Sequence, residues 1–143
     1  MSLSPKMSIE ELQRFLVQSF PQVADDYVVE AVGPMTITVR FSPSEKDLRP
    51  GGTVSGPAMF ALADVGVYLA LLAMIGPEAL AVTTNASLDF MRKPMPDKDL
   101  VADVRLLKVG RVLAVGDVLI RSEGMDDPVA RASMTYSIPP SRA

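Results

Sequence analysis

The chain has 143 residues, of which 48% are hydrophobic and 22% charged, and its net charge is −3. This composition is typical of one globular domain that buries ~70% of its unfolded surface, and it argues against disorder. The mild acidity offers no basic surface for nucleic acid. The sequence contains no histidine and no cysteine, which excludes imidazole bases, thiolate nucleophiles and His or Cys metal ligands. We therefore expect no metal site.

The N-terminal region predicts a helix. Residues 1–7 lack the apolar core of a secretory signal, so we expect a cytoplasmic protein. Ser8 and Glu11 have the spacing of a capping box, and Pro21 stops the helix. Between them, apolar residues recur at helical spacing, namely Ile9, Leu12, Phe15, Leu16 and Phe20. We interpret 1–143 as a single domain, with a helical segment at 1–24 and a core at 25–138.

Two strands are predicted next. The first covers residues 27–32, and Gly33-Pro34 forms a turn. Residues 35–41 alternate between apolar and polar side chains, which places four apolar residues on one face: Met35, Ile37, Val39 and Phe41.

A twenty-residue apolar run, Pro57 to Gly76, carries a single charge at Asp64. The run is too long for an ordinary strand and has no polar stripe, so we predict a buried helix that ends at Gly76-Pro77. A membrane span is disfavoured because the run is barely long enough, contains Asp64 and lacks adjacent basic anchors. We expect no membrane partner.

Long strand patterns complete the chain, at residues 80–93, 100–109, 112–122 and 129–138. Strands joined by short turns favour an antiparallel sheet. One long helix on such a sheet defines an α+β architecture. A sheet of five to six strands wrapped around the helix explains why the helix is apolar on every side.

Asp64 is the most informative residue of the chain. An ionised carboxylate in an apolar helix is costly unless it is paired or functional. It lies too far into the helix to be a cap, which leaves a structural carboxylate bonded to backbone or Thr groups, or a catalytic one. Residues 51–56 enter the helix as a loop of small residues that suits close approach of a ligand to the backbone.

Four short segments occur in an order and spacing shared with a known family: residues 52–64, 88–94, 109–111 and 128–136. They are similar to the family's G-T-x-H-G-G stretch with an acidic residue nine positions after the His, its F-L-R-P strand end, its hairpin G-R and its last strand. On these motifs the chain resembles hotdog-fold acyl-CoA thioesterases of the phenylacetic-acid-degradation (PaaI-like) group, over residues 25–138.

The resemblance implies a hotdog fold and hydrolysis of an acyl-CoA to free acid and CoA. It makes Asp64 the catalytic carboxylate, either as general base on water or as direct nucleophile. It makes the Gly56 N–H the donor that polarises the thioester carbonyl, a role that suits free N–H groups at a helix start. Thr83 and Thr84 lie near the position where relatives carry a hydroxyl that positions water.

The sequence departs from the family pattern on both sides of Gly56. Ser55 stands in place of the His, and we include it among the candidate catalytic residues. Pro57 replaces the second Gly and removes one N–H at the helix entrance. These changes leave a second function open, a non-catalytic dimer that binds acyl-CoA or another apolar ligand. Hydratase chemistry on this fold relies on a His in relatives, so it is disfavoured here.

Four basic residues at strand ends and turns are candidates for binding the phosphates of CoA: Arg92, Lys93, Lys108 and Arg111. A solvated rim is the alternative for them. CoA enters as part of the substrate, and we expect no other cofactor.

The spacing of Gly56 and Asp64 predicts a homodimer. Eight residues separate them, which is ~12 Å along one helix, whereas an oxyanion donor must lie ~3 Å from the carbonyl oxygen. A two-fold dimer instead brings Gly56 of one chain to the partner subunit's Asp64, and the family assembles in this way. We expect two composite sites per homodimer, with a dimer of dimers left open.

Overall fold

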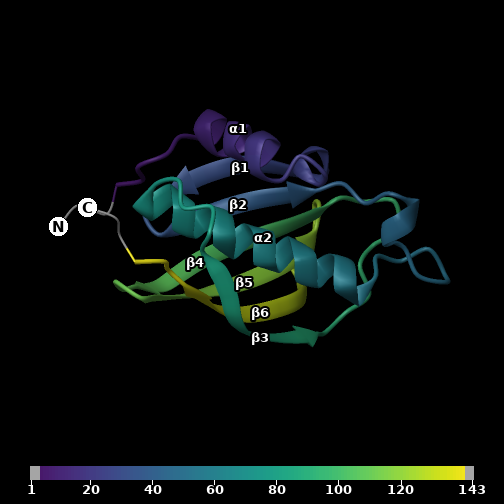
Figure 1. The fold of residues 1–143 in the computed structure, drawn as a ribbon. Helices are drawn as coiled ribbons and strands as arrows, with labels where there is room; N and C mark the ends of the chain where they lie inside the picture. Colours follow the sequence, from purple (N-terminus) through teal and green to yellow (C-terminus); the bar gives the residue numbers. More distant parts are fainter. Residues whose placement is uncertain (1–3, 141–143) are drawn as a thin grey trace.

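The computed structural model describes residues 4–140, and within them six strands form one antiparallel sheet (Figure 1). The helices are α1 (Ile9–Ser19) and α2 (Gly56–Ile75), with short 3₁₀ turns at Ala24–Asp26 and Glu45–Asp47. The strands are β1 (Tyr27–Gly33), β2 (Thr36–Phe41), β3 (Val82–Phe90), β4 (Leu100–Val109), β5 (Leu113–Ser122) and β6 (Pro128–Ser137). Their order across the sheet is β1-β2-β4-β5-β6-β3. The predicted α+β architecture is confirmed; residues 1–3 and 141–143 of the predicted domain lie outside the described residues.

Helix α1 begins at the predicted capping box. The Ser8 hydroxyl accepts from the Glu11 N–H at 3.1 Å, and the Glu11 carboxylate accepts from the Ser8 N–H at 3.0 Å. Leu12 and Leu16 are buried against the rest of the molecule. Gln13 fastens the helix to the edge of the sheet, because its Nε2 donates to the Tyr27 carbonyl at 2.9 Å and its Oε1 accepts from the Val29 N–H at 3.0 Å.

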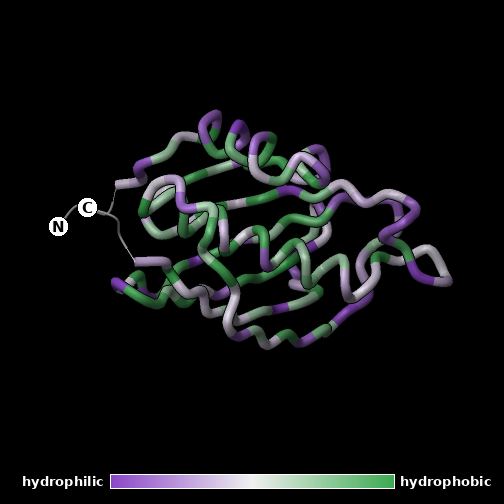
Figure 2. The backbone as a smooth tube through the Cα atoms, viewed as in Figure 1, coloured by the Kyte–Doolittle hydropathy of each residue, from purple (hydrophilic) through white to green (hydrophobic). Residues whose placement is uncertain are grey.

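Helix α2 fills the concave side of the sheet, as predicted from its uniform apolar composition (Figures 1 and 2). Its length and hydropathy would suit a membrane span, but 67% of its most apolar stretch is buried within the protein. Gly66 lets the helix approach the sheet closely, since a Cβ there would lie 2.9 Å from a methyl of Val104. The core of the protein therefore forms between α2 and the sheet.

The inner face of the sheet follows the predicted alternation, with Ile37, Val39 and Phe41 buried. Strand β3 is shorter than the predicted 80–93. It ends at Phe90 because the N–H groups of Met91 and Arg92 both donate to the same carbonyl, that of Val129. β3 forms one edge of the sheet, and none of its side chains is fully buried.

Candidate active site

Asp64 lies midway along α2, half-buried, beside the edge of the sheet formed by β6 and β3. The Thr83 hydroxyl donates to Asp64 Oδ1 at 2.5 Å. The Tyr136 hydroxyl lies 2.6 Å from the same oxygen and 3.0 Å from the Asp64 carbonyl. Both hydroxyls therefore hold Oδ1. Among residues 4–140 no group donates to Oδ2, whose lone pairs can accept from water or a ligand.

Tyr136 is a functional candidate that the sequence analysis missed. It is 3% exposed, and it stands directly opposite Thr83 in the pairing of β6 with β3. Burial, and then the hydrogen bond to Asp64, raise the pKa of Tyr136 above its ordinary value. The phenol therefore stays protonated and acts as a donor. The alternation along 129–138 marks an inward-facing Tyr136, but only the strand register brings it to Asp64.

The two neighbouring threonines separate at a β-bulge between Thr83 and Asn85. Thr83 contacts Asp64, whereas the exposed Thr84 donates to the Thr135 carbonyl at 3.3 Å. Of the two threonines predicted near the site, Thr83 therefore contacts Asp64 and the candidate catalytic residue Thr84 does not. A bulge shifts which residues face inward, and the sequence pattern carries no sign of it.

A cavity of about 240 Å³ adjoins Asp64. Asp64 is thus accessible and is not sealed in the core. The cavity is lined by residues from both helices, β3 and β6 and the segments before the first and third strands: Leu16, Phe20, Val23, Asp64, Val65, Tyr68, Ala81, Val82, Thr83 and Tyr136.

The start of α2 leaves one backbone N–H without an acceptor in residues 4–140, that of Gly56. Ser55 is the N-cap, and its hydroxyl accepts from the Ala58 N–H at 3.3 Å. The Met59 N–H donates to the Ser55 carbonyl at 3.2 Å, and Pro57 has no N–H. The predicted candidate Ser55 therefore serves as a cap, and Gly56 is free to bind a ligand oxygen.

A second cavity, of about 530 Å³, lies at this helix start and includes Gly56. Its described lining holds three basic residues, Arg49, Arg92 and Lys93, and no acidic one. The Arg92 guanidinium is anchored by donating to the Pro128 carbonyl at 2.7 Å. The structure thus places Arg92 and Lys93, two of the predicted phosphate ligands, in the same cavity as Gly56. It adds Arg49, which the sequence analysis missed because a loop has no periodic pattern.

The other two predicted phosphate ligands lie elsewhere. Lys108 is at the end of β4, and Arg111 is in the turn between β4 and β5. That turn lies at the opposite end of the sheet from the start of α2 (Figure 1), and neither residue lines the two cavities above. Within one chain they are not brought together with Arg92 and Lys93.

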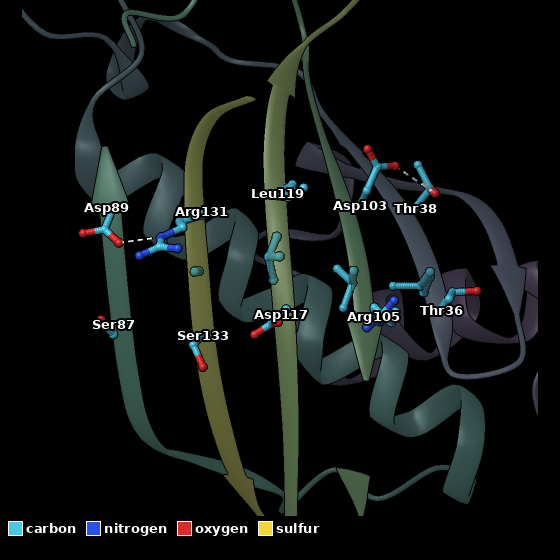
Figure 3. Close-up of a pocket in the computed structure, with 14 residues that line it drawn as sticks. Thr36, Thr38, Ser87, Asp89, Asp103, Arg105, Asp117, Leu119, Arg131 and Ser133 are labelled. Carbon is cyan, nitrogen blue, oxygen red and sulfur yellow. Dashed lines mark hydrogen bonds and ion pairs between the residues drawn. The ribbon is translucent and has the colours of Figure 1, made fainter. Parts of the chain in front are cut away.

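A larger cavity, of about 680 Å³, occupies the face of the sheet opposite α2 (Figure 3). An ion pair between Asp89 and Arg131, 2.7 Å long, crosses from β3 to β6 there. Thr38 donates to Asp103 at 3.3 Å on the other side of the same face. None of the predicted site residues lines this cavity, so we place the candidate active site at α2.

Comparison with known proteins places this chain in a family. Residues 51–129, more than half of the chain, match the thioesterase superfamily. A candidate thioesterase from Silicibacter sp. TM1040 is 56% identical, with 96% of each chain covered and a TM-score of 0.90. The chain belongs to the thioesterase superfamily, and its hotdog fold is confirmed. No significant match appears among curated proteins.

More distant structures extend the likeness. A mutant of the phenylacetic acid degradation protein PaaI from Thermus thermophilus is 25% identical over 83% of this chain and 99% of that one, with a TM-score of 0.71. Thioesterase superfamily member 2 from zebrafish is 17% identical over 94% and 100% of the two chains, with a TM-score of 0.82, which bears on the fold alone. The predicted resemblance to PaaI-like thioesterases is confirmed.

Proposed function

We propose that this protein hydrolyses acyl-CoA thioesters to free acid and CoA. Membership of the thioesterase superfamily supports thioester hydrolysis in general. The observation that carries the proposal is the Asp64 carboxylate, which two hydroxyls hold at Oδ1 while a cavity adjoins it. A purely structural carboxylate needs no such cavity, whereas a catalytic one must meet its substrate.

In the proposed reaction, Asp64 provides the base or nucleophile and the Gly56 N–H stabilises the carbonyl oxygen. As a general base, Asp64 takes a proton from water through Oδ2, and the water oxygen bonds to the thioester carbon. As a nucleophile, the carboxylate itself forms that bond, and water then hydrolyses the resulting anhydride. In both routes the carbonyl oxygen becomes negative, the Gly56 N–H at the positive end of α2 stabilises it, and its collapse expels the CoA thiolate.

A two-fold dimer completes each site in this proposal. Gly56 and Asp64 of one chain stand ~12 Å apart on α2, too far to serve one carbonyl. Phe60 lies one turn before Asp64 on the same side of the helix and is 41% exposed. The adjoining strand β3 exposes Val82 and Phe90 by more than half. This apolar surface along α2 and β3 fits a second copy of the chain.

The basic cavity at Gly56 suits the phosphates of CoA. Arg49, Arg92 and Lys93 offer charged donors without a competing carboxylate in the described lining. A thioester carbonyl at Gly56 and phosphates at these side chains place the CoA moiety along the start of α2. Lys108 and Arg111 lie outside this cavity, and their role as phosphate ligands stays a prediction. We also propose that the enzyme acts in the cytoplasm.

The proposal is tested by measuring the release of free thiol from butanoyl-, octanoyl-, hexadecanoyl- and phenylacetyl-CoA. We expect turnover above the uncatalysed rate for at least one thioester. The competing function, a binding module, predicts a different result. Thioesters would then raise the melting temperature of the protein by mass action while no thiol is released from any of them, and that outcome contradicts hydrolysis.

A further inference from the structure

The cavity at Asp64 is polar at one end and apolar elsewhere. Asp64, Thr83 and Tyr136 form the polar end. The remaining lining side chains are aliphatic or aromatic, including Leu16 and Phe20 of the α1 region. If Asp64 acts on the thioester carbon at the polar end, the apolar part of the cavity is left for the acyl chain attached to that carbon.

One wall of the cavity comes from the end of α1 and the residues that follow it, Leu16, Phe20 and Val23. Phe20 is the C-cap of α1, is 39% exposed, and packs edge-on against Tyr68 of α2 with ring centroids 5.6 Å apart. Gln13 holds α1 on β1 through its two hydrogen bonds. The wall is therefore fixed to the sheet and is not a loose terminal segment.

The size of the cavity bounds what fits behind the carbonyl. Its volume of about 240 Å³ equals that of roughly eight water molecules at about 30 Å³ each, which suits a compact acyl group. A long fatty acyl chain would have to extend past the Phe20 side chain. Of the three aromatic side chains that line the cavity, only Phe20 is exposed, whereas Tyr68 and Tyr136 are buried in the core. Phe20 can therefore be changed with the least damage to the core.

We infer that the end of α1 forms a wall of the acyl site, and that Phe20 in this wall makes the site favour compact apolar acyl groups over long ones. The inference rests on the proposed function for its catalytic meaning. The cavity itself can also be tested without turnover. Phe20 is a specificity residue in this account and takes no part in bond making.

The test is the substitution Phe20→Ala, with Phe15→Ala as the matched control. Phe15 also packs on Tyr68, with centroids 6.3 Å apart, but it does not line the cavity. We expect Phe20→Ala to raise kcat/KM for dodecanoyl-CoA about tenfold and to leave butanoyl-CoA unchanged, because each added methylene gains a contact only when space exists. Phe15→Ala should keep the wild-type order of preference. The inference is wrong if Phe20→Ala preserves that order too.

A second readout separates this inference from hydrolysis. Primary amides with the same alkyl chains as the acyl-CoA substrates can donate their N–H groups to Asp64. Their binding therefore probes the cavity even if the protein hydrolyses no thioester. We expect hexanamide to raise the melting temperature of the wild type, and decanamide to do so only in Phe20→Ala. If both variants respond equally to both amides, the inference fails whether or not thioesters are hydrolysed. If thiol release is absent but the amide pattern holds, only the proposed function fails.

Discussion

Replacing Asp64 by Asn is expected to lower kcat for the preferred thioester substrate by about 10³-fold. The amide has nearly the shape of the carboxylate, and its oxygen can still accept from the Thr83 and Tyr136 hydroxyls that hold Oδ1. It can neither take a proton from water nor attack a thioester. The loss should therefore fall on kcat, with KM little changed, and is measured by steady-state thiol release.

The control for this substitution is Asp126→Asn, which makes the same chemical change at an exposed position in the turn between β5 and β6. It should retain wild-type rates. The melting temperatures of both variants report whether the fold survives. A folded Asp64→Asn protein with full turnover would exclude Asp64 as base and as nucleophile.

Gly56→Val is expected to lower kcat/KM by about 10²-fold, the usual cost of losing one oxyanion donor. A Cβ at this position would lie 3.3 Å from Cζ of the Phe90 ring, so a branched side chain adds bulk beside the Gly56 N–H. The first position of a helix tolerates valine, so the stability of each chain should change little. Because Phe90 lies on the proposed dimer surface, size-exclusion chromatography checks that the variant still forms the same oligomer as the wild type.

A graded series makes the Gly56 result specific. Gly56→Ala adds only the Cβ and should lose less activity than Gly56→Val, while both keep melting temperatures near that of the wild type. Equal kcat/KM for wild type and Gly56→Val would show that no substrate oxygen meets this amide. Steady-state thiol release at sub-saturating substrate provides the comparison.

The order of helices and strands was predictable because each has a strong local signal. The boundaries of β4 match the predicted 100–109, and α2 begins one residue before the predicted Pro57. The apolar run could be interpreted as a core helix because Asp64 and the following strands disfavour a membrane span. The end of β3 was not predictable, since it depends on two amides that share the Val129 carbonyl.

The candidate site was also predictable only where a residue has a strong local signal. A lone charge in an apolar run identifies Asp64 from sequence alone. Its partners depend on register, which a bulge after Thr83 resets. The sequence therefore named both Thr83 and Thr84 without separating them, and Tyr136 was missed. Arg49 was missed because only the path of a loop brings it to Gly56. Contacts between distant segments are set by packing, which leaves no local pattern.

In the dimer that we propose, Asp64 of one chain and Gly56 of its partner act on the same thioester. The most direct test purifies a mixed dimer, with one tag on an Asp64→Asn chain and another on a Gly56→Val chain. Such a dimer has one site with both residues intact and one site with neither. We expect this mixed dimer to give about half of the wild-type thiol release, far above either parent dimer. A mixed dimer no more active than its parents would contradict the proposal.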